Sequence, residues 1–117
     1  MKIIEQQMLA AIHARRDWRK SNTRVSVNKA AGIAKVWLYE SLICLYFYNT
    51  GLRLYSGDGF RTLTTKSRLN ALGAGIYQRQ GEWYNSDGTP FLDKELYSIY
   101  FREKEIRMRD RDKNLFK

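Results

Sequence analysis

The chain has 117 residues, 44% of them hydrophobic, and a single cysteine, so it is long enough for one domain with one core. This composition excludes a wholly disordered polypeptide, and the longest apolar run, Leu42 to Tyr48, is too short to cross a membrane. Twenty-one Lys and Arg against twelve Asp and Glu give a net charge of +9 and a sequence pI near 9.8, which favours a polyanionic partner such as DNA or RNA.

The basic residues are concentrated at the two ends of the chain. Residues 1–30 carry seven basic and two acidic side chains, and residues 102–117 carry seven and four. We therefore expect one α+β domain over residues 1–101, followed by a charged C-terminal extension over residues 102–117.

The first half of the chain predicts a helix followed by strands. Residues 3–19 lack Gly and Pro and place apolar side chains at helical spacing, which predicts an amphipathic helix ending near Lys20. Apolar and polar residues then alternate, with turn residues between the runs. This pattern predicts a four-stranded antiparallel meander with strands at residues 24–28, 34–39, 42–48 and 52–55.

The second half predicts a short helix, a hairpin and a last helix. Residues 64–72 begin with Thr64, which can cap a helix, and end before a glycine. Residues 76–80 and 82–85 flank Gly81 and predict a hairpin. Leu92, Leu96, Ile99 and Ile106 indicate a final helix, which the densely charged tail either continues or leaves frayed.

The residues that commonly carry catalysis are sparse. The chain has one His and one Cys, no pair of them at metal-ligand spacing, and no glycine-rich phosphate loop. We therefore predict that the protein is not an enzyme and uses no metal or cofactor. His13, beside two arginines, fits a solvated helix face or a phosphate contact better than a metal site.

Two basic clusters are candidate sites for phosphate. Arginine offers planar donors that suit phosphate, although basic residues also gather at helix ends for structural reasons. The first cluster surrounds Trp18 and comprises Arg15, Arg16, Arg19, Lys20 and Arg24. The second lies at the start of the short helix, where cations oppose the helix dipole, and comprises Arg61, Thr65, Lys66, Ser67 and Arg68.

Aromatic side chains of the meander form a third candidate. Simple alternation puts basic and aromatic residues on one sheet face and aliphatic residues on the other. Such a face could stack bases or anchor a protein, or helices could cover it. With Trp18, the candidate anchors are Trp37, Tyr39, Tyr46 and Tyr48.

Two short motifs resemble a family of small uncharacterised proteins of tailed bacteriophages. They are N-T-x-V at Asn22–Val25 and T-T-K-S-R-L-N-A-L at Thr64–Leu72, and an aromatic hairpin follows at Tyr77 to Tyr84. The resemblance covers residues 4–85. It implies a phage origin but no activity. With a start that lacks the basic-then-apolar order of a secretory signal and no membrane-length apolar run, we expect the protein in the cytoplasm of the infected bacterial host. This chain departs from the pattern at Leu38-Tyr-Glu-Ser41, where relatives tend to have Leu-His-Gly-Asn.

Three functions remain open from the sequence. The leading hypothesis is a phage accessory protein that binds DNA or RNA mainly through phosphate contacts. The alternative is a host-takeover or anti-defence inhibitor that docks on an acidic surface of a bacterial protein. The third is a virion-associated subunit whose charged tail orders on assembly.

Overall fold

The chain begins with helix α1 (Ile3–His13), which buries one stripe of side chains. Met8, Ala11 and Ile12 face the core, as their helical spacing predicts. The computed structural model describes residues 1–100 of the chain. Predictions that concern residues 101–117, including Ile106 and the charged extension, lie outside the described residues.

Five strands follow α1 and pair antiparallel in sequence order, so the meander has one strand more than the sequence predicted. They are β1 (Trp18–Lys20), β2 (Thr23–Asn28), β3 (Ile33–Leu38), β4 (Ser41–Phe47) and β5 (Arg53–Tyr55). Helix α2 (Leu63–Ala71) comes next, and strands β6 (Tyr77–Arg79) and β7 (Glu82–Tyr84) form a separate hairpin. The predicted α+β fold is confirmed.

The extra strand arises because α1 ends earlier than predicted. The helix stops at His13, and Arg15 takes a left-handed conformation with φ 53°, which turns the chain away from the helix axis. The carboxylate of Asp17 then accepts a hydrogen bond of 2.7 Å from the amide of Val27. Trp18 pairs with Val25 in the sheet, so the segment predicted as the last helical turns is strand β1.

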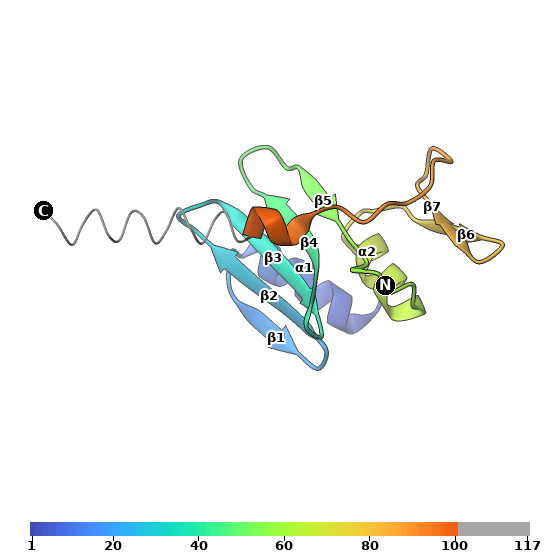
Figure 1. Ribbon diagram of the computed structural model, residues 1–117. Coiled ribbons are helices and arrows are strands. Elements are labelled where there is room, and N and C mark those ends of the chain that lie inside the picture. Colours follow the sequence, from blue (N-terminus) through green and yellow to red (C-terminus); the bar gives the residue numbers. More distant parts are fainter. Residues whose placement is uncertain (101–117) are drawn as a thin grey trace, which may run out of the picture.

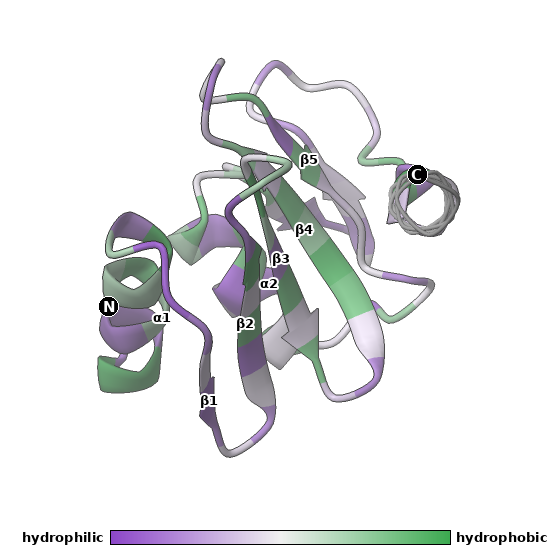
Figure 2. Ribbon diagram, turned by 90° about the vertical axis from the view of Figure 1, so that its left-hand side faces the viewer, coloured by the Kyte–Doolittle hydropathy of each residue, from purple (hydrophilic) through white to green (hydrophobic). Residues whose placement is uncertain are grey.

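Packing covers both faces of the sheet. One core joins α1 and α2 to the first face through residues such as Val25, Val36 and Leu69. A second core joins the other face to Leu96, at the start of a helical segment at residues 96–100. This orange segment crosses β3 and β4 in Figure 1, and Figure 2 shows α1 on the opposite side of the sheet. Leu92, predicted to belong to this helix, is instead exposed in the extended segment before it.

The strand register overturns the predicted division of the sheet faces. Tyr46 lies directly opposite Ala34, and Lys35 lies opposite Leu45. Because cross-strand partners share a face, Tyr46 faces the helices together with the aliphatic side chain of Ala34, and not beside Lys35. A further irregularity between Val36 and Trp37 shifts the register of the end of β3. Aromatic and aliphatic residues are therefore mixed on both faces.

Candidate nucleic-acid interface

Two arginines of the first basic cluster meet on the β1–β2 hairpin. Arg19 and Arg24 are direct cross-strand partners, so both side chains project from the same face. Like charges in this position repel each other, and no carboxylate among residues 1–100 forms an ion pair with either one. Within residues 1–100, the pairing therefore leaves two adjacent positive charges without an ion-pair partner.

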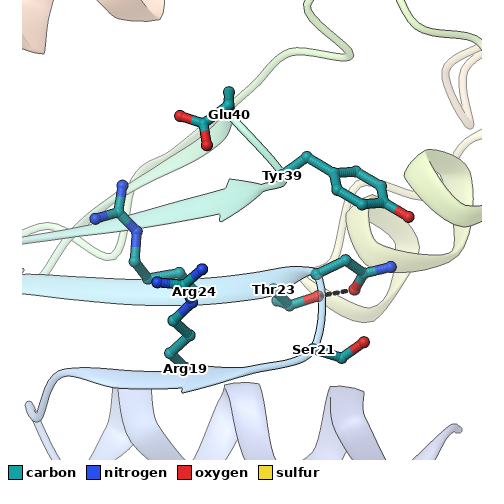
Figure 3. Close-up of a pocket in the computed structure, with 7 residues that line it drawn as sticks. Arg19, Ser21, Thr23, Arg24, Tyr39 and Glu40 are labelled. Carbon is teal, nitrogen blue, oxygen red and sulfur yellow. Dashed lines mark hydrogen bonds between the residues drawn. The ribbon is translucent and has the colours of Figure 1, made fainter.

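These arginines line a pocket at the hairpin end, which we call the hairpin pocket. Its volume is about 570 Å³, and its lining comprises Arg19, Ser21, Asn22, Thr23, Arg24, Tyr39 and Glu40. Figure 3 shows the two arginine side chains together on one side of the pocket and the ring of Tyr39 on the other. Glu40 is the acidic member, and its exposed carboxylate forms no ion pair with Arg19 or Arg24.

Aromatic packing holds Arg24 in place. Its guanidinium carbon lies 4.8 Å from the ring centroid of Trp37. Trp37 is itself buried, with the rings of Tyr97 and Tyr100 packed edge-on at 6.3 and 5.5 Å. A cation stacked on a fixed ring loses less side-chain freedom when it binds a ligand, because part of its orientation is already set.

Hydrogen bonds from Tyr39 and from α2 also hold the turn between β1 and β2 in place. The Asn22 carbonyl accepts a hydrogen bond of 2.7 Å from the Tyr39 amide. Arg68 of α2 donates from Nε to Oγ1 of Thr23 at 3.0 Å and from Nη2 to Oδ1 of Asn22 at 3.4 Å. The two motifs that carry the phage resemblance thus contact each other through Asn22 and Thr23, two residues of the pocket lining.

The other members of the first cluster take different positions. Arg16 and Lys20 are exposed, but Lys20 pairs with Thr23 and so projects from the sheet face opposite Arg19. Arg15 lies over the ring of Tyr48, at 4.4 Å from its centroid, on the helix side of the sheet. Trp18 is half-buried against the core. The structure therefore divides the predicted cluster between the two faces.

The second predicted cluster does not form an open phosphate site. Arg68 is 4% exposed and Thr65 is 2% exposed, so neither can meet a nucleic-acid backbone. Arg68 forms a buried ion pair with Glu5 of α1 at 2.8 Å, and Ser67 donates to the same carboxylate at 2.6 Å. Arg68 was expected in the first turn of this helix, but it lies in the last turn of α2 and pairs with a carboxylate 63 positions away in sequence.

The two remaining basic residues of this cluster also have partners. Lys66 donates to Gln78 of β6 at 3.1 Å. Arg61 pairs with Asp93 at 3.0 Å and lies over the rings of Trp83 and Phe91. Both contacts connect α2 or the loop before it to later segments, so we assign them structural roles.

The predicted aromatic anchors separate in the same way. Trp37 is buried under the helical segment at residues 96–100, and Tyr46 and Tyr48 pack against the core beneath α1. Tyr39 differs because it is 72% exposed and has a left-handed backbone with φ 53°, which is unusual for an aromatic residue. Tyr39 is therefore the predicted anchor that remains available to a partner.

Sequence reasoning missed the residues that organise these clusters. Glu5 shares the buried stripe of α1 with Met8 and Ile12, and a carboxylate on an apolar stripe indicates a buried partner. Asp93 accepts hydrogen bonds from the amides of Gly57 and Gly59 at 2.8 and 2.9 Å. The position of Glu5 on an apolar stripe was a signal in the sequence. The contacts of Asp93 are long-range, and residue spacing does not reveal them.

The fold and the hairpin surface define a small basic α+β protein with arginines grouped on a sheet edge. Among residues 1–100, no group of acidic, His or Cys side chains could hold a metal ion, and no helix is long and apolar enough to span a membrane. The family model described as Kyanoviridae Gp96 protein matches residues 1–108, and the chain belongs to this phage protein family. No curated protein and no solved structure matches the chain.

Proposed function

We propose that the protein binds nucleic acid through phosphate contacts made by the β1–β2 hairpin. The observation that carries this proposal is the cross-strand pair Arg19 and Arg24, which has no acidic partner among residues 1–100. Contacts of this kind position a protein on a backbone and carry little base readout. The expected place of action is the cytoplasm of the infected host.

The test removes the paired charge and keeps a polar, uncharged side chain at each position. The double variant Arg19→Gln with Arg24→Gln is compared with Lys29→Gln with Lys94→Gln, which removes two exposed lysines far from the pocket lining. Fluorescence anisotropy of labelled duplex DNA, single-stranded DNA and RNA measures affinity at low salt. We expect the arginine variant to bind about tenfold more weakly or worse and the lysine variant to remain close to wild type. Equal affinities of both variants would contradict the proposal.

A second candidate is docking on a bacterial protein, as an anti-defence or host-takeover inhibitor would do. It is favoured by an apolar pocket of about 420 Å³ that adjoins the hairpin pocket through Tyr39 and includes Phe60 in its lining. Phe60 is 57% exposed and the neighbouring Leu63 is 76% exposed. Exposed aromatic and aliphatic residues around a pocket suit a protein anchor. A stoichiometric complex from host lysate that survives nuclease treatment and is lost in Phe60→Ser would support this candidate.

A further inference from the structure

A second cationic pocket lies on the helix side of the sheet, away from Arg19 and Arg24. It has a volume of about 400 Å³ and lies among the end of α1, strand β4 and the end of α2. Its polar lining comprises His13, Arg15, Tyr46, Tyr48 and Arg53. Within the described part of the chain, no Asp or Glu lines it, so its arginines have no carboxylate partner there. We call it the helix-end pocket.

The arginines of this pocket are held in place by tyrosine rings. Arg15 lies 4.4 Å from the ring centroid of Tyr48, and Arg53 lies 5.2 Å from that of Tyr46. The two tyrosine rings contact each other edge-on at 5.1 Å. The four side chains therefore form a row with a cation at each end, in which each guanidinium is supported by an aromatic ring.

Hydrogen bonds fix the same row to the two helices. Tyr48 donates its hydroxyl hydrogen to the Ile12 carbonyl at 2.5 Å, near the end of α1. Arg53 donates from Nη1 to the Leu72 carbonyl at 3.2 Å, just past the end of α2. Arg15 enters the row from the left-handed position that ends α1, where its amide donates to the Ile12 carbonyl at 3.1 Å in a common helix C-terminal motif. The end of the helix thus brings Arg15 into the pocket lining.

We propose that the helix-end pocket binds a nucleoside phosphate, either free or as the phosphorylated end of a strand. The arginines and His13 supply donors and charge for phosphate. The aliphatic side chains of the lining supply the apolar surface on which a base would lie, and they are Leu9, Ile12, Ala71 and Leu72. This site uses Arg15 and Arg53, so it is independent of the Arg19 and Arg24 surface proposed above.

The test compares two adjacent arginines in the full chain. Arg15→Gln alters the pocket, and Arg16→Gln removes the same charge from an exposed neighbour that does not line it. Isothermal titration uses AMP, inorganic phosphate and adenosine, and then 5′-phosphorylated and 5′-hydroxyl oligonucleotides. A thermal melt followed by circular dichroism confirms that each variant is folded. The variant Arg19→Gln with Arg24→Gln is titrated in parallel and should bind AMP like wild type.

We expect AMP to bind at least about tenfold more tightly than adenosine and Arg15→Gln to lose at least about tenfold, with Arg16→Gln near wild type. Preference for the 5′-phosphorylated oligonucleotide with the same dependence on Arg15, but no AMP binding, would support the pocket and assign its ligand to a strand end. Binding that ignores the phosphate, or that is the same in Arg15→Gln and wild type, would overturn the proposal.

Discussion

The buried carboxylate of Glu5 connects α1 to α2 through Ser67 and Arg68. Burial alone raises the pKa of Glu5, but hydrogen bonds from Ser67, Arg68 and the Lys2 amide, together with the charge of Arg68, outweigh it and lower the pKa. The side chains of Arg68 and Glu5 are only 5% and 4% exposed. Glu5 is therefore ionised and paired with Arg68 in the folded protein.

Replacing one member of this pair should destabilise the fold. Arg68→Met leaves the Glu5 charge buried without its cation and removes the donors to Asn22 and Thr23. We expect a loss of about 3–5 kcal/mol in the free energy of unfolding, measured by urea denaturation. The double variant Glu5→Leu with Arg68→Met should recover much of this loss, because no charge remains buried. A loss below about 1 kcal/mol in the single variant would contradict the buried pair.

The lowered pKa of Glu5 also predicts a pH dependence. A depressed folded-state pKa stabilises the protein above the unfolded pKa, and this stabilisation is lost as pH falls through the folded value. Glu5→Gln lacks the titrating group, so the stability difference between wild type and this variant should shrink between about pH 6 and pH 3.5. Urea midpoints at both pH values measure it. A difference that stays constant or grows on acidification would argue against this role of Glu5.

At the scale of elements, the predicted and observed first residues of α2 differ. The sequence pointed to Thr64 as the cap, but Thr62 precedes the helix, and its hydroxyl accepts a hydrogen bond from the Thr65 amide at 3.1 Å. Both residues can cap a helix by type. The pattern therefore predicted the helix and its length closely but placed its cap two residues too late.

The cap assignment can be tested with two threonines of the same helix end. Thr62→Ala removes the acceptor for Thr65 and should destabilise the protein by about 1 kcal/mol. Thr64→Ala serves as the matched control and should change stability by less than about 0.5 kcal/mol, because Thr64 makes no capping contact. Thermal or urea unfolding followed by circular dichroism gives both values. A larger loss in Thr64→Ala would place the cap where the sequence first suggested.

Strands and hairpins were largely predictable because their signals are local. Alternation and turn residues located β2 to β5 and the β6–β7 hairpin within one or two residues. The predicted end of α1 was wrong because residues 16–20 include no helix-breaking residue. Only pairing with β2 makes Trp18–Lys20 a strand. Local pattern thus identified elements and failed where a tertiary contact decided between helix and strand.

At the scale of the whole molecule, the arrangement of charge depends on register and long-range pairing. The first basic cluster could be predicted as a cluster, but its division between two faces follows from the cross-strand pairs. Arg68 was predicted to belong to a phosphate-binding cluster, but it is buried in an ion pair with Glu5, which is distant in sequence. The hairpin pocket and the helix-end pocket could not be predicted, because each joins side chains from several elements.

The role proposed for Arg19 and Arg24 is to neutralise phosphates of a bound nucleic acid. The most direct measurement is the slope of log Kobs against log salt concentration for the preferred nucleic acid, which reports the number of neutralised phosphates. We predict that Arg19→Gln with Arg24→Gln lowers the magnitude of the slope by about 1 to 2, whereas Lys29→Gln with Lys94→Gln leaves it unchanged. A slope in the arginine variant equal to that of wild type would contradict this role.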